Sequence, residues 1–324
     1  EAAHFLNSYG ITSVVNATGN LKEIEVYGAL RDRGQLTVRT RTSFAEVSVN
    51  HHLTPQFLAD LEKARTTYHD DWVSANLVKF FSDGAGATSA QLQPAADGTQ
   101  TRPWYEPADY QKTVLELDRR GYQIMTHSIG DAAARMVLDA YEQVEKINGP
   151  RDRRFRMEHL FSLTPQDIPR FLKLSVIADM QPSFCCSGNA PNRNHRWQTL
   201  EKTGATLAFS SDWPCTWPPD PYIGIQEAVT RQSRPFGNSA SSPDPEYFMP
   251  EEAVTVEQAV NAYTRAAAYA RFSEDKLGTL EPGKEADLVV LSQDIFTVAH
   301  EDIGKTKAMM TMAGGKVVFE RPKL

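Results

Sequence analysis

Short apolar stretches alternate with longer amphipathic stretches along most of the chain. The apolar stretches are rich in β-branched and aromatic residues, which is typical of β-strands. Segments between them carry apolar residues at helical spacing, for example Tyr110, Val114 and Leu117. This alternation predicts parallel strands joined by crossover helices, and therefore an α/β fold. The expected strands lie at 11–17, 36–44, 77–84, 122–131, 154–161, 175–184 and 205–214.

Polar residues at the ends of these strands indicate which α/β architecture is formed. Barrel enzymes build their sites from the carboxyl ends of the strands, so polar strand ends favour a (β/α)8 barrel. An open nucleotide-binding sheet needs a glycine fingerprint after its first strand. The nearest sequence, GAGA at 84–87, lacks the third glycine and is better explained as a turn.

The last part of the chain has a different character. A helix rich in small residues is expected at 255–272, and the phrases EPGKEADLVVL and AGGKVVFE each read as a turn that leads into a strand. We therefore expect two domains, a barrel over 1–276 and a part of a small β-sheet domain over 277–324.

Four strand ends offer side chains with metal-binding or acid–base chemistry. Side-chain alternation directs Lys79, His127, His159 and Asp212 toward a common mouth, with Met157 on the same face as His159. Two imidazoles and a carboxylate suit Zn²⁺ or a similar ion. Such an ion polarises a carbonyl group and lowers the pKa of bound water to roughly 7.

Each of these residues also has a purely structural explanation. A strand-end histidine is often only hydrogen-bonded, Asp212 can form a turn, and Lys79 can extend to solvent. Asp83 and Asp131 are expected to shape loops or cap helices. Four polar residues at equivalent strand positions favour a shared site. The other histidines are interpreted as surface or loop residues: His4, His51, His52, His69, His195 and His300.

Composition excludes several classes of partner. The net charge of −7 and pI of about 5.7 argue against nucleic acid and anionic lipid. There is no run of eighteen apolar residues to cross a membrane. Three cysteines, with Cys185 and Cys186 adjacent, do not form a disulfide framework; we expect two buried thiols and a cytoplasmic protein.

Six phrases in order, LVKFFSDGA, THSIGD, RMEHL, QPSF, FSSDWP and LGTLEPGKEADLVVL, resemble the amidohydrolase superfamily. The most similar branch is amidohydrolase family 3, which includes N-substituted formamide deformylases. The resemblance implies a (β/α)8 TIM barrel with a small β-sandwich and a metal centre. It implies that His127 and His159 are ligands, that Asp212 is a ligand and the proton shuttle, and that Lys79 bridges two metals after carboxylation by CO₂.

One departure from the family pattern concerns its first barrel strand, which ends in a His-x-His pair. This sequence has no such pair, and the adjacent His51 and His52 would point to opposite faces of a strand. The seven expected strands therefore correspond to strands two to eight. We expect the first strand, its two ligands and the other half of the sandwich to come from a segment in the same or another chain.

The expected activity is hydrolysis of an amide or formamide C–N bond in a small molecule by a hydroxide activated on one or two divalent ions, preferably zinc. Asp212 would act as general base and then as general acid. Loops 185–197 and 230–250 would cover the mouth, and Trp104, Trp213 and Trp217 would supply pocket walls or core packing. The alternative is an impaired or regulatory barrel that binds one metal or none. The sequence does not decide whether the protein forms a homo-oligomer.

Overall fold

The computed structural model describes residues 1–45, 53–95, 97–185, 195–232 and 249–322. Seven strands form one parallel sheet in the order β1-β2-β3-β4-β5-β6-β7, so chain neighbours are also sheet neighbours. All seven strands predicted from the sequence are confirmed. Their bounds are β1 (Ser13–Gly19), β2 (Arg39–Phe44), β3 (Val73–Phe81), β4 (Gln123–Ser128), β5 (Arg156–His159), β6 (Ile177–Met180) and β7 (Leu207–Phe209).

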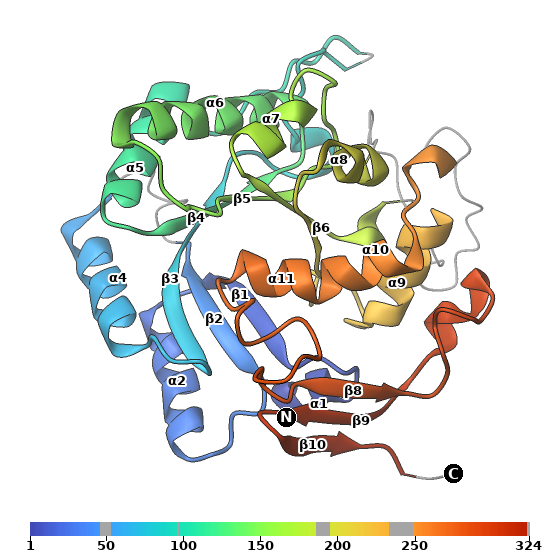
Figure 1. Ribbon diagram of the computed structural model, residues 1–324. Helices are drawn as coiled ribbons and strands as arrows, with labels where there is room; N and C mark the ends of the chain where they lie inside the picture. Colours follow the sequence, from blue (N-terminus) through green and yellow to red (C-terminus); the bar gives the residue numbers. More distant parts are fainter. Residues whose placement is uncertain (46–52, 96, 186–194, 233–248, 323–324) are drawn as a thin grey trace.

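Helices follow the strands in sequence and surround the curled sheet (Figure 1). They are α1 (Ala2–Asn7), α2 (Leu21–Asp32), α4 (Pro55–Thr67), α5 (Pro107–Arg119), α6 (Asp131–Asn148), α7 (Ile168–Lys173), α8 (Trp197–Thr203), α9 (Pro221–Thr230), α10 (Val256–Tyr263) and α11 (Arg265–Ala270). Local signals fix several ends. The Thr54 side chain accepts from the Phe57 amide before α4, Thr255 and Gln258 form a capping box on α10, and Gly204 ends α8 in the left-handed conformation.

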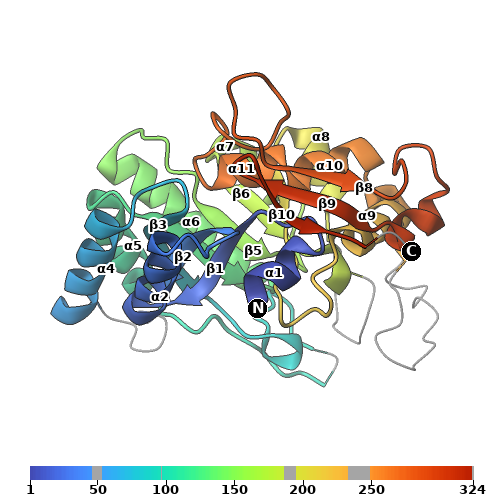
Figure 2. The ribbon, with the colours of Figure 1, turned by 90° about the horizontal axis from the view of Figure 1, so that it is seen from below.

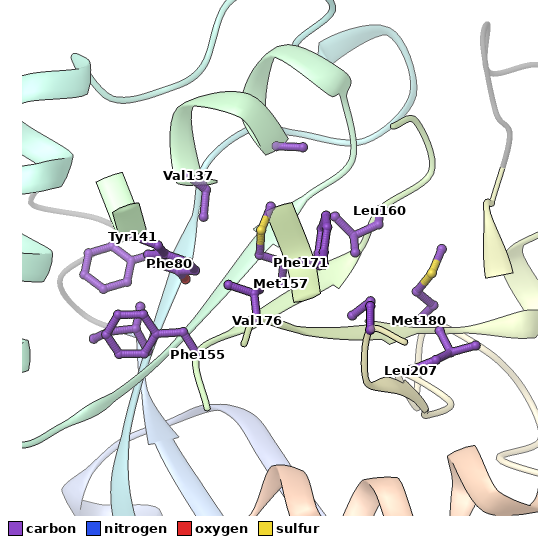
Figure 3. Packing of buried hydrophobic residues seen from close by; sticks show 14 of the residues in the cluster. Phe80, Val137, Tyr141, Phe155, Met157, Leu160, Phe171, Val176, Met180 and Leu207 are labelled. Atoms are coloured by element: carbon purple, nitrogen blue, oxygen red, sulfur yellow. The ribbon is translucent and has the colours of Figure 1, made fainter. Parts of the chain in front are cut away.

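The outer face of the sheet is apolar and packs on the helices. Figure 3 shows Met157 of β5 among Phe171 and Val176, with Tyr141 of α6 near Phe80 and Phe155. All of these side chains are buried in one hydrophobic cluster. Burial of each large apolar side chain stabilises the fold by about 1.5–3 kcal/mol. This layer holds the strands, and therefore their carboxyl ends, in fixed positions.

The opposite face of β5 is polar. Buried Arg156 donates to both carboxylate oxygens of Glu158, at 3.0 Å each, and to Asp179 of β6 at 2.7 Å. Burial raises the pKa of Glu158, and the Arg156 guanidinium opposes this rise. A buried ion-paired network therefore lies on the inner face of the sheet, where α11 also packs through Ala266 and Ala270.

A second, antiparallel sheet in the order β10-β9-β8 lies in the tail, as predicted. Its strands are β8 (Leu288–Leu291), β9 (Ala308–Ala313) and β10 (Lys316–Glu320). Figure 2 shows this small sheet beside α1, and Thr311 Oγ1 donates to the carbonyl oxygen of Asn7 at 2.7 Å. A domain boundary at residue 277 stays a prediction. Within the described ranges, no helix has the length and hydrophobicity needed to cross a lipid bilayer.

Candidate functional site

The four predicted site residues lie at or near the carboxyl ends of β3, β4, β5 and β7. Lys79 is two residues from the end of β3, His127 is the penultimate residue of β4, and His159 ends β5. Asp212 follows β7 by three residues. Lys79, His127 and His159 are buried, and Asp212 is partly buried. Because parallel strands end at one edge, these residues share one end of the sheet.

The two histidines form the centre of this group. Their ring centroids are 4.5 Å apart and the planes are inclined at 66°. The Lys79 ammonium lowers the pKa of both imidazoles and also acts on the Asp212 carboxyl. The structure therefore brings His127 and His159 into contact, and the charge of Lys79 reaches both rings and the Asp212 carboxyl.

His127 has an unused nitrogen in a buried position. Its Nε2 makes no hydrogen bond within the described residues and lies 3.5 Å from Oδ1 of Asp83. Burial, followed by the charge of Lys79, lowers the pKa of His127 to about 3. The imidazole is therefore neutral near pH 7, which is the form that binds a metal ion.

His159 is oriented by Gln181, which follows β6. His159 Nδ1 and Gln181 Oε1 are 2.6 Å apart, and Gln181 Nε2 donates to Ser210 Oγ at 2.9 Å. Because an amide oxygen only accepts, Nδ1 carries the proton and Nε2 keeps its lone pair. Burial lowers the pKa of His159 well below its usual value, so this ring is also neutral.

The predicted alternation around His159 is wrong. Met157 packs against the helix layer, whereas His159, two residues later, contacts His127 and Gln181 instead. His159 has a φ of 75°, in the left-handed region that non-glycine residues seldom adopt. This turn of the backbone ends β5 and directs the ring to the inner side, where simple alternation would not place it.

Asp212 also has a left-handed backbone, with a φ of 55°. Its carbonyl oxygen accepts from the Cys215 amide at 2.8 Å, so the residue forms a turn as well as offering a carboxyl group to the site. Burial raises the pKa of Asp212, and the nearby Lys79 ammonium opposes the rise. The turn and the site role are therefore compatible.

Lys79 does not extend to solvent, since it is only 3% exposed. Its Nζ lies 5.1 Å from the centroid of the Phe81 ring. Burial lowers the pKa of Lys79, while the carboxylates of Glu158 and Asp212 act in the opposite direction. The result is an amine with an increased neutral fraction beside the two imidazoles.

Asp83 and Asp131 shape loops, as predicted. Asp83 is fully buried and accepts from the amides of Ala90, Ile129 and Gly130 at 2.8–3.0 Å. Burial raises its pKa to about 6 despite these three donors. Asp131 opens α6 and accepts from the Leu92 amide at 2.7 Å, but no side-chain cap is formed there. Asp83 therefore fixes the loop after β3 against the loop after β4.

Several other predictions concern the surroundings of the site. His195 is not a surface residue: it is 1% exposed and packs on Phe161, with ring centroids 4.7 Å apart. Cys185 is disulfide-bonded, which corrects the prediction of free buried thiols. Trp217 stacks on Phe5 and is 60% exposed, and Trp104 is exposed as well. His51, His52, Cys186 and most of the two predicted covering loops lie outside the described residues.

The donor set fits a metal ion but is small. In the part of the chain that the structure describes, no group of three or more His, Cys, Asp or Glu side chains is arranged to hold one. The two neutral imidazoles, with the buried unpartnered nitrogen of His127, are the donors that such an ion needs. Sequence reasoning missed Gln181, whose signal is its place directly after β6, one residue beyond the strand end.

Comparisons with known proteins show the family of the chain. A sequence profile described as the amidohydrolase family matches residues 1–319. Protein LONG AFTER FAR-RED 3 of Arabidopsis thaliana is 32% identical over 277 residues, which cover 81% of this chain and 46% of the relative. N-substituted formamide deformylase of Arthrobacter pascens is 26% identical over 259 residues, which cover 75% of this chain and 45% of the relative.

The fold is also found among solved structures. An uncharacterized metal-dependent hydrolase from Pyrococcus furiosus superposes with a TM-score of 0.72 at 24% identity, covering 91% of this chain and 59% of that one. The chain spans about half the length of these two curated relatives. The TIM-barrel resemblance seen in the sequence is confirmed, and the chain belongs to the amidohydrolase family.

Proposed function

We propose that the protein is a metal-dependent hydrolase that cleaves an amide or formamide C–N bond in a small molecule. The observation that carries the proposal is the pair of neutral imidazoles of His127 and His159, 4.5 Å apart at the carboxyl ends of neighbouring strands. The formamide deformylase among its relatives supports the substrate class. The cytoplasmic location predicted from the sequence stays a prediction.

His127, His159, Asp212 and a carboxylated Lys79 would hold the ion, and zinc suits their nitrogen and oxygen donors. When bound, zinc would polarise the substrate carbonyl and lower the pKa of a water molecule to roughly 7. Any further ligands would lie outside the described residues, which provide only this small set.

Carboxylation of Lys79 has a simple chemical basis. The neutral amine attacks CO₂, a new N–C bond forms, and one proton leaves to give a carbamate with two oxygen donors. Burial favours the neutral amine by lowering the pKa of Lys79. The resulting anion would be compensated by the ion it helps to hold.

Asp212 would move the proton. As a carboxylate it would accept a proton from the attacking water, and as a carboxylic acid it would return that proton to the leaving amine. Burial raises its pKa, which makes the carboxylate a stronger base than an exposed aspartate. Gln181 would keep the His159 ring in the tautomer that leaves Nε2 free to bind.

The substitution Asp212→Asn in the full-length protein tests this role. We expect hydrolysis of a formamide or amide substrate to fall by about 10²–10⁴-fold, the typical contribution of a general acid–base group. Most of the metal should remain bound because the imidazoles are intact. Asp275→Asn, an exposed aspartate after α11, is the control. Near-normal turnover by Asp212→Asn would rule out the proposed proton transfer.

A second function, a regulatory barrel that binds one ion or none, is favoured by the small donor set of the described residues. The two functions differ in what a chelator does. For the hydrolase, removing the metal abolishes turnover and zinc restores it. For the regulatory protein, the native full-length form shows no metal-dependent hydrolysis of amides at any metal concentration.

A further inference from the structure

A cavity of about 620 Å³ lies at the amino-terminal ends of β2, β3 and β4, the end of the sheet opposite His127 and His159. Ser74 and Ala75 line it from the start of β3, and Gln123 lines it from the start of β4. Two further lining residues are Arg41 on β2 and Arg271 directly after α11, and the charge of Arg271 acts on Arg41; Figure 1 shows these two elements. Neither belongs to the site described above.

Arg41 is a buried cation that lacks an opposite charge. It is 4% exposed, and its Nε is buried with no hydrogen-bond partner. Within the described ranges it forms no ion pair, and the group it approaches is the Phe272 ring, 5.5 Å from its Cζ to the centroid. Burial, followed by the charges of Arg271 and Arg156, lowers the pKa of Arg41 to about 9.

Arg271 repeats this pattern. Its Nε and Nη1 are both buried with no hydrogen-bond partner, and no ion pair of its side chain is found among the described residues. Burial and then the charge of Arg39 lower its pKa to about 10. Both guanidinium groups are therefore still charged at pH 7, close to one another, with at least three buried N–H groups unused.

The acidic residues around the cavity are engaged elsewhere. Four of the carboxylates that line it each pair with a different basic residue, and a fifth, Asp275, is exposed to solvent. The pairs are Asp70 with Arg31, Asp71 with Lys276 at 2.7 Å, Asp152 with Arg154 at 2.9 Å and Glu285 with Arg39 at 3.1 Å. None of these carboxylates forms an ion pair with Arg41 or Arg271 among the described residues, although the charges of Asp287 and Asp71 partly offset the burial of Arg271.

Two neighbouring cations, one buried and one partly buried, that form no ion pair are unfavourable, because each loses hydration. Arginine cannot escape this by losing its proton, unlike lysine or histidine. A doubly charged oxyanion would balance both charges and accept from the unused N–H groups, since guanidinium matches phosphate geometry. We propose that Arg41 and Arg271 bind the phosphate group of a small phosphorylated molecule, or free phosphate, in this cavity. This site is independent of the proposed hydrolase function.

The test is calorimetric titration of the full-length protein with inorganic phosphate against a chloride solution of equal ionic strength. Saturable binding is expected, and Arg41→Met and Arg271→Met should each weaken it at least tenfold. Arg33→Met removes an exposed arginine after α2 and should leave the Kd unchanged. His127→Ala should also leave it unchanged, which separates this cavity from phosphate bound by a metal.

A phosphorylated sugar that binds more tightly than phosphate in the same titrations would indicate a phosphorylated metabolite, whereas equal affinity would indicate free phosphate. Melting temperatures without phosphate give a second readout, since both methionine variants should fold and melt no lower than the wild type. No saturable binding by the wild type, or unchanged affinity in both variants, would overturn the proposal. So would strong destabilisation of the variants without phosphate, because it would mean that a carboxylate of the protein already pairs with these arginines.

Discussion

The two ends of the parallel sheet bury ionisable side chains in different ways. At the carboxyl end, His127 and His159 are neutral because burial lowers their pKa values far below 7. At the amino end, Arg41 is at least as deeply buried but keeps its charge, with a pKa of about 9. The same loss of hydration therefore produces a neutral imidazole from histidine and a fixed cation from arginine.

A second contrast lies within β2 itself. Arg39 and Arg41 are two residues apart on the strand, and both are nearly inaccessible to solvent. Arg39 donates to Asp287 at 2.9 and 3.0 Å and pairs with Glu285 of the tail. Arg41 has no such partner among the described residues. Arg39 therefore joins the small sheet to the barrel, whereas Arg41 is available to a ligand.

The largest effect on stability is expected from Arg39→Met. The substitution leaves the carboxylate of Asp287, which is 7% exposed at its side chain, without its cation. Breaking such a pair costs about 3–5 kcal/mol of unfolding free energy. Chemical denaturation of Arg39→Met beside Arg33→Met measures the difference. A loss below about 1 kcal/mol would mean that Arg39 does not hold the tail.

The next effect concerns the carboxyl end, where Asp83 holds two loops together. Asp83→Ala removes the acceptor of three buried backbone N–H groups, and each unsatisfied donor costs about 1–3 kcal/mol before relaxation. We expect a total loss of about 2–4 kcal/mol. Asp131→Ala, which removes one contact to an exposed loop residue, is the matched control and should cost about 1 kcal/mol. Equal losses in the two variants would contradict the role of Asp83.

A smaller effect is expected from Gln181→Met, which keeps the volume of the side chain but removes the acceptor for His159 Nδ1. Loss of such an orienting partner typically lowers metal affinity by 10–100-fold. Competition with a coloured chelator measures this affinity in the full-length protein. Ser210→Ala removes only the oxygen that accepts from Gln181 Nε2, one hydrogen bond further from the His159 ring, and should change the metal affinity less. Unchanged affinity in Gln181→Met would show that His159 needs no orientation.

The smallest effect has the opposite sign. Arg41→Met removes an uncompensated buried charge, so in the absence of anions the unfolding free energy should stay equal or rise by about 1 kcal/mol. Comparison with Arg39→Met on the same strand sharpens the contrast, since the two substitutions are chemically identical. Destabilisation of both variants to the same extent would remove the distinction between paired and unpaired arginines.

The sequence predicted the strands and the strand-end positions of the candidate site residues because both depend on local pattern. Apolar runs located all seven strands, and alternation placed Lys79 and His127 correctly. The orientation of His159 was missed because a left-handed φ at a strand end is set by tertiary contacts rather than by residue order. The cluster of Arg41 and Arg271 was missed for a similar reason, since these residues are far apart in the sequence and meet only in the fold.

The central claim is that the neutral histidine pair at the carboxyl end holds a metal ion. Metal analysis of the purified full-length protein tests it most directly, comparing the wild type with His127→Ala/His159→Ala and with His69→Ala as a control. The account predicts at least one divalent ion per chain in the wild type and the control, and its loss from the double variant. Equal metal content in all three proteins, or none in the wild type, would contradict it.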